Sequence, residues 1–367
     1  MPEKQPKQYR YSKKIRIWTI AGSSAMALIG VLCITAFILI SSVLGKINFS
    51  ENGPVDPNAD VDIDLEDDEY NGVVVDPSEY DNAAAVSDIP LRGDGNGIHN
   101  ILLVGVDSRQ NNFVGLSDTN VILSINDKTK TVKMISILRD TWVSIPGRDK
   151  DGDGQDDICK FNTAYAYGRH TLQHKTIAQN FRLDIEDYIG VNFQVLPVLI
   201  DAMGGLDISV TAKEMTQIPA NGCFVSKYAA DNSGFSPLTG APGVYHLNGF
   251  QAMEYARIRK IDSDFQRTAR QRKVLTLLIE KAKKMSYTQL IDVVYKAASR
   301  VDTNMTTDEF LDIAANSLTY ASYTVEGDYH IPEDGSYKFT SISGKGSGIL
   351  LTDPKETVKN LHKYIYG

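Results

Sequence analysis

The feature that most constrains this chain is an uninterrupted apolar run near its N-terminus. From Ile17 to Leu44, 28 residues pass without a charge, and most of them are Ile, Leu, Val or Ala. A helix needs about 20 apolar residues to cross a bilayer core, whereas the apolar part of a cleaved signal peptide spans only about 7–15. The run therefore predicts a retained transmembrane helix over residues 17–44.

The charges before this run predict its orientation. Residues 1–16 carry six basic residues against a single acid, Glu3. Basic segments of this kind remain on the cytoplasmic side of a membrane. We therefore expect a single-pass protein of the cell membrane, with a cytoplasmic tail over residues 1–16 and everything after about residue 45 outside the cell.

Residues 45–92 are predicted to form an acidic, disordered linker. Positions 47–90 hold thirteen acids and neither Lys nor Arg, and four prolines interrupt any periodic pattern. Like charges repel, and such a composition buries too little apolar surface to fold. The rest of the chain, residues 91–367, has a net charge of −1. This charge argues neither for nor against a nucleic-acid partner, and none is predicted. Any anion-binding site must be a local cluster of basic residues.

Residues 93–367 are expected to form one extracytoplasmic α/β domain. The pattern predicts strands at 100–106, 120–125, 131–138, 188–193 and 206–210, with further short β-like runs at 338–343 and 348–351. It predicts helices at 164–182, 195–203, 248–257, 265–284, 288–299 and 307–322, and one at the C-terminus. This alternation predicts a central, mostly parallel or mixed β-sheet covered by helices.

Charged residues gather where the predicted strands end. Asp107 and Arg109 directly follow the first buried strand, Asp118 leads into the second, and Arg139 follows the third. Ligands bind beyond the carboxyl ends of strands in open α/β sheets. Taken alone, each group has a simpler interpretation, since an Asp-Ser-Arg at a strand end is commonly an ordinary turn.

A second basic group follows about 120 residues later along the chain. Arg257 and Arg259 share one face of an extended stretch, and Arg267 and Gln271 share one stripe of a helix. Several arginines in one place repel unless a polyanion neutralises them, and guanidinium groups bind pyrophosphate well. Asp107 and Asp118 offer the hard oxygen ligands that Mg²⁺ prefers. The simpler interpretation is a solvated helix face paired with nearby acids.

Seven blocks in order resemble the LytR-CpsA-Psr family of cell-wall polymer ligases. They are NILLVGVDSR (100–109), LSDTNVILSIN (116–126), VKMISILRDTWVSIPG (132–147), KFNTAYAYG (160–168), DAMGGLDISV (201–210), YHLNGFQAMEYARIR (245–259) and DFQRTARQRKVL (264–275). The resemblance covers roughly residues 98–284, and the predicted anchor and tether also suit a membrane protein of a Gram-positive-type bacterium.

The resemblance implies a Mg²⁺-dependent phosphotransferase, with Mn²⁺ as an alternative metal. Such enzymes move a phosphate-linked glycopolymer (teichoic acid, capsule or another wall polysaccharide) from a polyprenyl-pyrophosphate carrier to peptidoglycan. Asp107 and Asp118 resemble its metal ligands. The implied catalytic residues are Asp107, Asp118, Arg139, Arg257 and Arg259, and the implied pyrophosphate cradle is Arg109, Arg139, Arg257, Arg259, Arg267 and Gln271. Hydrolysis of the lipid pyrophosphate and a non-catalytic role in wall binding or regulation remain open alternatives.

The chain departs from the family pattern at two positions. Leu116 stands where an arginine is frequent, and Leu138 stands where a proline precedes the arginine equivalent to Arg139. The loss of one cationic contact puts the preferred polymer and the catalytic rate in doubt, while the fold is unaffected.

Three further signals lie outside these blocks. Asp149, Asp151, Asp153 and Asp157 match the first half of a calcium loop, although position 12 is Lys160 instead of Glu, so a weak structural Ca²⁺ site or a bare acidic turn is expected. His170 and His174 lie four residues apart without the Glu of a zinc protease, which predicts a solvated pair. Cys159 and Cys223 would face an exposed compartment, where one disulfide or two free thiols are both compatible with the sequence.

Overall fold

The computed structural model describes the later four-fifths of the chain almost continuously. The described residues are 42–50, 55–58, 73–74, 76, 80, 82–106, 113, 115–192, 195–220, 237–258, 261, 264–343 and 345–367. The chain forms two compact units, Met1–Lys46 and Ile47–Gly367, and only residues 42–46 of the first are described. Among all described residues, no helix combines the length and apolar character that a membrane span requires. The predicted span, residues 17–44, lies outside them except for positions 42–44.

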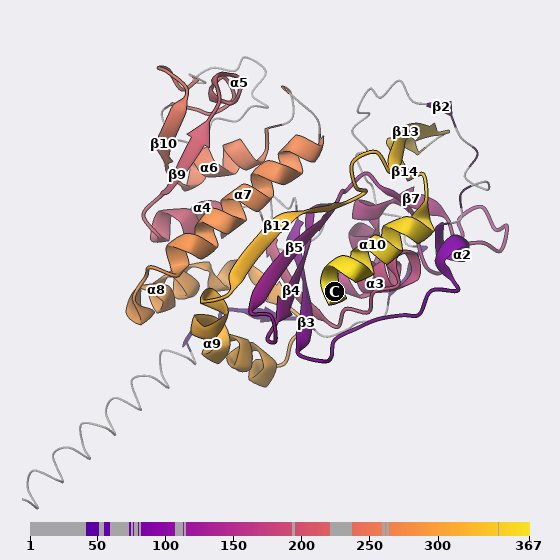
Figure 1. The fold of residues 1–367 in the computed structure, drawn as a ribbon, viewed down its shortest axis with the longest axis horizontal. Helices are drawn as coiled ribbons and strands as arrows, with labels where there is room; N and C mark the ends of the chain where they lie inside the picture. Colours follow the sequence, from indigo (N-terminus) through magenta and orange to yellow (C-terminus); the bar gives the residue numbers. More distant parts are fainter. Residues whose placement is uncertain are drawn as a thin grey trace, which may run out of the picture. The chain divides into compact units, whose positions relative to one another are not determined.

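The second unit is organised around a seven-stranded sheet (Figure 1). Its order is β1 (Asn48–Phe49), β11 (Val301–Thr303), β8 (Asp187–Asn192), β3 (Ile98–Val106), β4 (Ser117–Asn126), β5 (Thr131–Ile137) and β12 (Thr324–Ile331). The pairs β1–β11, β3–β8 and β5–β12 are parallel, and the other three are antiparallel. The sequence predicts a mostly parallel or a mixed sheet, and the structure shows a mixed one.

Alternation along the central strands gives the sheet two buried faces. Leu102 and Val104 of β3 join the largest apolar cluster, to which α3 (Phe161–Phe181) and α10 (Pro354–Tyr366) contribute residues such as Phe181 and Leu361. Ile101, directly before Leu102, points to the other face and joins a cluster under α9 (Thr307–Ala321). Successive strand residues point to opposite faces, so a continuous apolar run such as that of β3 marks a strand covered on both sides.

A further apolar cluster lies beyond the sheet. It unites α4 (Val195–Ala202), β9 (Leu206–Val210), α5 (Ala212–Met215), β10 (Gly243–Leu247), α6 (Gly249–Ala256), α7 (Asp264–Ala282) and α8 (Tyr287–Ala297). Capping boxes begin α5, α6 and α8, where Thr211, Asn248 and Ser286 each accept a hydrogen bond from the backbone of the third helical residue. The helix α7 runs alongside β12, which connects this cluster to the main sheet (Figure 1).

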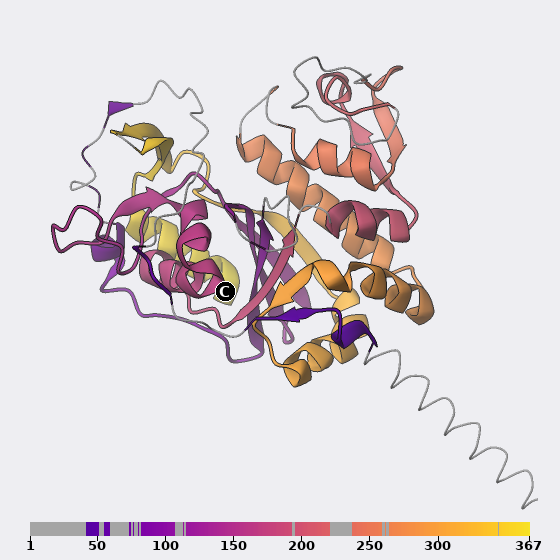
Figure 2. The ribbon, with the colours of Figure 1, turned by 180° about the vertical axis from the view of Figure 1, so that it is seen from behind.

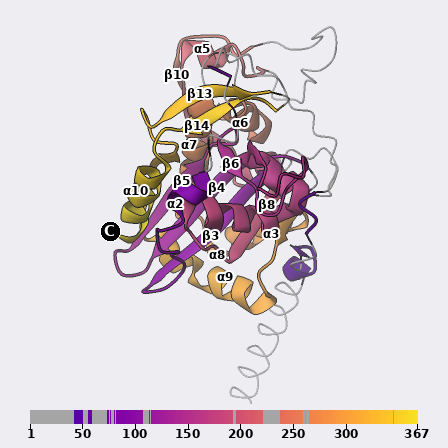
Figure 3. The same ribbon diagram turned by 90° about the vertical axis from the view of Figure 1, so that its right-hand side faces the viewer.

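Two small sheets complete the unit. A hairpin of β13 (Tyr337–Ile342) and β14 (Gly346–Leu351) pairs with β2 (Val73–Val74), and β6 (Trp142–Ser144) pairs with β7 (Ile158–Lys160). The strands β14 and β6 are in contact. Figure 3 shows β13 and β14 lying side by side at one end of the main sheet. The loop between β6 and β7 carries the acidic run 149–157.

Described positions from 47 to 92 belong to the folded unit, where the sequence predicts a disordered linker over residues 45–92. Strand β1 adds to the sheet edge beside β11 (Figure 2), and its Phe49 ring meets that of Phe310 with centroids 6.2 Å apart. The short helix α2 (Asn82–Val86) packs on α3 and α10, and Val86 is completely buried. Isolated apolar residues among the acids make these contacts. The average composition of the segment, which is acidic and polar, does not predict them.

Two further expectations are revised by the structure. His170 is buried and stacks on Tyr188 with ring centroids 4.6 Å apart, so the prediction of a solvated His170–His174 pair is wrong. Helix α3 has non-helical backbone at Gly168 and Arg169, directly before the buried His170. Cys159 is a buried free thiol, and Cys223 lies outside the described residues.

Candidate active site

An acid and a base from adjacent strands form the centre of the candidate site. Asp118 lies at the start of β4 and Arg139 just beyond the end of β5. The antiparallel register pairs Val121 with Ser136, so continuing it by three residues places Asp118 opposite Arg139. The Nη1 of Arg139 donates to Oδ1 of Asp118 at 2.9 Å, and the exposed fractions of the two side chains are 7% and 11%.

A second acid and a second base extend this pair into a row of alternating charges. The Nε of Arg139 donates to Oδ2 of Asp140 at 3.1 Å, and Nζ of Lys160 lies 3.4 Å from the other oxygen of that carboxylate. Asp140 and Lys160 are themselves buried. The backbone of Asn162 donates to the carbonyl of Arg139 at 3.0 Å, which fixes the start of α3 against this row. The guanidinium group of Arg139 is thus held at two edges and oriented before any ligand arrives.

Helix α7 brings a second basic residue to Asp118. Arg267, which is 2% exposed, places Nη2 3.5 Å from the backbone carbonyl of Asp118. Gln271 follows one turn later on α7 and is half-buried. Arg270, on the same stretch of α7, donates to the carbonyl of Ile258 at 2.6 Å.

Four further residues are predicted for the site. The structure describes Arg257 but not the other three. Arg257 ends α6, and its Nη1 lies 4.0 Å from Oε1 of Glu254. The contact of Arg270 with Ile258 brings the chain that directly follows Arg257 beside α7. Asp107, Arg109 and Arg259 lie outside the described residues. The described part of the chain thus brings together Asp118, Arg139 and Arg267, which are distant in sequence.

Asp118 has the chemistry for a magnesium ligand. A carboxylate has about four lone-pair positions, so one side chain can accept from a guanidinium group and also bind a cation. Mg²⁺ is usually bound by one or two carboxylates, with water and substrate phosphates completing an octahedron. Asp118 would hold the ion, which would neutralise charge on phosphate oxygens next to Arg139.

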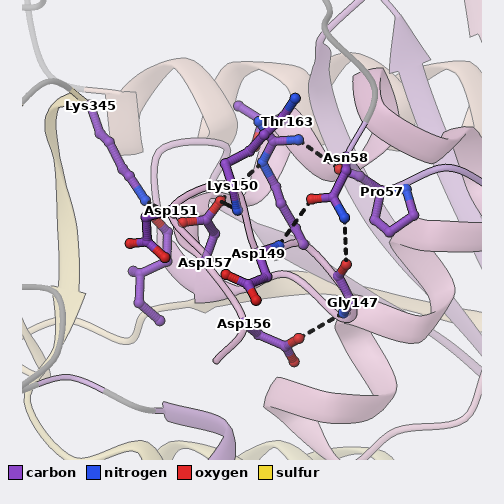
Figure 4. Close-up of polar contacts among 12 residues, drawn as sticks. Pro57, Asn58, Gly147, Asp149, Lys150, Asp151, Asp156, Asp157, Thr163 and Lys345 are labelled. Atoms are coloured by element: carbon purple, nitrogen blue, oxygen red, sulfur yellow. Dashed lines mark hydrogen bonds and ion pairs between the residues drawn. The ribbon is translucent and has the colours of Figure 1, made fainter. Parts of the chain in front are cut away.

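The acidic loop directly precedes β7, and it brings together three of the four predicted calcium ligands. One carboxylate oxygen each of Asp149, Asp151 and Asp153 lies within 4.8 Å of the others. Asp157, the predicted fourth ligand, instead forms ion pairs with Arg148 at 3.5 Å and Lys345 at 3.0 Å. Figure 4 shows this loop between Asn58 and Lys345. The grouping of three carboxylates suits a weak calcium site without Asp157.

Sequence reasoning assigned no role to Asp140 and Lys160. The position of Asp140 directly after Arg139 is the one available signal, because a residue at a strand end can share a guanidinium group with its neighbour. Lys160 was noted only as the residue that excludes an EF-hand, and its ion pair depends on the pairing of β6 with β7, which the sequence does not reveal.

Comparison with known proteins fixes the family. The LytR-CpsA-Psr family model matches residues 69–350, which is most of the chain. The chain belongs to the LytR-CpsA-Psr family. Its mixed sheet and flanking helices agree with solved structures of LytR-CpsA-Psr proteins, among them TagT bound to LIIa-WTA, with a TM-score of 0.56 and 26% identity over 74% of this chain and 91% of that one.

Two relatives similar in sequence have names that state an activity. The polyisoprenyl-teichoic acid–peptidoglycan teichoic acid transferase TagT of Bacillus subtilis (strain 168) is 32% identical over 202 residues, 53% of this chain and 57% of TagT. The transferase of the same description, TagU, of Bacillus mycoides (strain KBAB4) is 31% identical over 246 residues, 65% of this chain and 72% of TagU. The chain thus matches just over half the length of the first relative.

Proposed function

We propose that this LytR-CpsA-Psr protein transfers a phosphate-linked anionic glycopolymer from a polyprenyl-pyrophosphate carrier to peptidoglycan. The observation that carries the proposal is the meeting of Asp118, Arg139 and Arg267 from two strands and a helix. The names of the relatives TagT and TagU describe transfer of teichoic acid from a polyisoprenyl carrier to peptidoglycan, which supports the same reaction class.

The proposed reaction asks the protein to position groups and to neutralise charge. A hydroxyl of the acceptor glycan attacks the phosphorus that carries the polymer, so a new O–P bond forms. The bond to the bridging pyrophosphate oxygen breaks, and polyprenyl monophosphate leaves with the bonding electron pair. Arg139 and Arg267 would contact the non-bridging oxygens, where guanidinium groups stabilise the charge that develops in the transition state. The proton of the attacking hydroxyl would pass to a carboxylate at the site, Asp107 or Asp118.

The proposal includes magnesium and a membrane anchor. Mg²⁺ held by Asp118, and by Asp107 according to the family pattern, would supply further positive charge against the pyrophosphate. Residues 17–44 would hold the domain at the outer surface of the membrane, where lipid-linked donors are available. Arg109, Arg257, Arg259 and Gln271 would complete the pyrophosphate cradle.

A product assay tests the proposal. The full-length chain in detergent is incubated with a polyprenyl-pyrophosphate-linked teichoic-acid precursor, with and without peptidoglycan strands. Transfer predicts polymer joined to the strands through a phosphodiester, together with polyprenyl monophosphate. Equal release of polymer phosphate with and without strands would identify a hydrolase instead. A non-catalytic role predicts that Asp118→Ala and Arg139→Ala both preserve wall assembly in cells.

A further inference from the structure

Asp118 is the extra residue of a β-bulge. In the pairing of β4 with β3, Thr119 lies opposite Gly105, and the next pair joins Ser117 to Val106. Asp118 is therefore skipped in the register between the two strands. Bulges of this kind bend a strand and re-aim a side chain, and they are frequent beside active sites. The direction of the Asp118 carboxylate thus depends on what holds the bulge.

A buried amide on α3 reaches this bulge. The Nε2 of Gln173 donates to Oγ of Ser117 at 2.9 Å and to Oδ1 of Asn120 at 2.6 Å. The Nδ2 of Asn120 in turn donates to the backbone carbonyl of Ser117 at 2.9 Å. Gln173 and Ser117 are fully buried, and Asn120 is nearly so. The three residues form a closed ring of hydrogen bonds around the position directly before Asp118.

The same ring is connected to Arg139. The Oγ of Ser117 donates to the carbonyl of Asn162 at 3.3 Å, and the backbone N–H of Asn162 donates to the carbonyl of Arg139 at 3.0 Å. Asn162, at the start of α3, is itself buried. One residue therefore joins the segment that carries the acid to the segment that carries the base. A change in the ring is expected to move the Asp118 carboxylate relative to the Arg139 guanidinium group.

A second buried amide on α3 provides a comparison. Asn180 donates to the carbonyl of Ser144 at 2.7 Å and to that of Thr176 at 2.9 Å, and it accepts from the N–H of Ser144 at 3.0 Å. These bonds fix the helix to β6. Both amides join α3 to a strand, but Gln173 bonds to residues before and after Asp118. The position of Gln173 therefore suits control of the bulge as well as stabilisation of the fold.

We infer that Gln173 is a positioning residue, which holds the bulge through Ser117 and Asn120 and so aims the Asp118 carboxylate at the reacting phosphate. The inference rests on the proposed function, because Asp118 acts on a phosphate only if the protein carries out phosphoryl transfer. A misplacement of about 1 Å, even from a change distant from the chemistry, can lower a rate about 100-fold. Because the contacts that bind the substrates are retained, the effect belongs in kcat and not in KM.

The experiment compares variants of the full-length chain in detergent. Gln173→Met keeps the length of the side chain and removes its hydrogen bonds, and Ser117→Ala removes the hydroxyl that accepts one of them. Asn180→Leu is the matched control, because it removes a buried amide from the same helix. Release of polyprenyl monophosphate gives kcat and the KM of each substrate. Hydrogen exchange followed by mass spectrometry measures opening of the segment around Asp118, and melting curves measure stability.

Gln173→Met is expected to lower kcat about 10- to 100-fold and to change the KM of each substrate less than about threefold. Ser117→Ala should lower kcat by a smaller factor, because Asn120 still accepts from Gln173. Both variants should speed hydrogen exchange around Asp118, since the bulge opens more easily. Asn180→Leu should lower the melting temperature about as much as Gln173→Met, but it should keep the wild-type kcat and the wild-type exchange around Asp118.

An unchanged kcat in both Gln173→Met and Ser117→Ala would overturn the inference. It is equally overturned if Asn180→Leu lowers kcat as far as Gln173→Met does, since loss of stability alone would then explain the effect. A variant that does not fold is recognised by its melting curve, and the other variant then decides. Failure of the proposed function is a distinct result, because the wild type would release no polyprenyl monophosphate while hydrogen exchange still reports whether Gln173 holds the bulge.

Discussion

The Nη1 of Arg139 lies 2.9 Å from Oδ1 of Asp118, and both side chains are largely withdrawn from water. Asp118 lies near the start of β4 and Arg139 just beyond the end of β5, so the ends of two adjacent antiparallel strands bring the side chains together. Charges in such surroundings interact more strongly than on the surface, and an isolated one is costly. The pair therefore stays together without substrate and presents a guanidinium group that is already oriented for a phosphate.

Arg139→Lys is expected to lower the transfer rate by about 100-fold or more, the typical effect of losing one donor to a developing negative charge. An ammonium group keeps the charge, but it cannot reproduce the planar contacts to Asp118 and Asp140. The rate of polyprenyl monophosphate release measures the effect. Arg300→Lys on the 3-10 helix η2 (Ala298–Arg300) is the control and should keep the wild-type rate. Activity within threefold of the wild type for Arg139→Lys would remove Arg139 from the mechanism.

Removal of divalent metal by EDTA is expected to stop transfer, and Mg²⁺ should restore it. Asp118→Asn removes one negative charge from the proposed ligand, so it should raise the Mg²⁺ concentration needed for half-maximal rate about tenfold, a typical effect of weakening a metal site. A Mg²⁺ titration of both proteins measures this shift. Full activity in EDTA would contradict the proposed role of the metal.

His99 is expected to stabilise the fold mainly at neutral and acidic pH. Its Nε2 lies 3.1 Å from Asp187 and its Nδ1 2.5 Å from Asp94, and hydrogen bonds to Asp187 and then Asp94 raise its pKa to about 10. A raised folded pKa gives stability that is fully present below about pH 6.5, the ordinary value, and disappears as pH rises through 10. His99→Gln should therefore lower the unfolding free energy at pH 6, by about 1 kcal/mol for this partly exposed group. Urea unfolding at pH 6 and pH 10 should show the difference shrinking, and an equal loss at both would refute the explanation.

His170 and His174 are expected to destabilise the fold in acid. Burial lowers the pKa of His170 to about 4 and that of His174 to about 3. Because the unfolded chain takes up these protons first, stability is full above about pH 6.5 and falls as pH drops from there toward 4. His170→Phe keeps a ring against Tyr188 and should make stability less dependent on pH in this window. Melting temperatures at pH 7 and pH 5 test this, with the same change at the exposed His246 as control.

Calcium at millimolar concentration is expected to raise the melting temperature of the wild type. Asp149, Asp151 and Asp153 bring three carboxylates together, and a ligand that binds only the folded state stabilises it. Asp151→Asn should reduce this gain, whereas Asp88→Asn, an exposed acid elsewhere, should keep it. Melting curves with Ca²⁺ and with Mg²⁺ provide the comparison. No gain for the wild type would leave the loop as an ordinary acidic turn.

The predicted strands and helices that the structure contains are those with a clear apolar pattern. The run around Leu102 is buried on both faces, so its hydrophobicity is continuous and its strand easy to find. Strand β12, Thr324–Ile331, was missed because Glu326 and Gly327 interrupt its pattern at a sheet edge. Strand β11 is only three residues long and contains Asp302, whose burial the sequence does not indicate.

The part of the candidate site that lies at the ends of strands could be predicted, because sequence motifs mark those ends. The motif containing Asp118 and the one containing Arg139 lie on adjacent strands, and the structure brings them together. The third partner, Arg267, is expected from the family resemblance, but its position beside Asp118 depends on how α7 packs on β5 and β12, a tertiary feature that the sequence does not reveal. The same limitation explains why Lys160, whose position depends on the β6–β7 pairing, received no role.

Asp302 has a consequence for anyone who shortens this protein. Its buried carboxylate accepts from Arg169 at 2.9 Å, from Tyr188 at 3.1 Å, from Ser50 at 2.5 Å and from Asn48. A truncated form beginning at residue 93, where the sequence places the domain boundary, would delete Ser50 and Asn48 together with the outermost strand. It would expose the edge of β11 to pairing with other molecules. Recombinant versions intended to stay monomeric should therefore begin before Ile47.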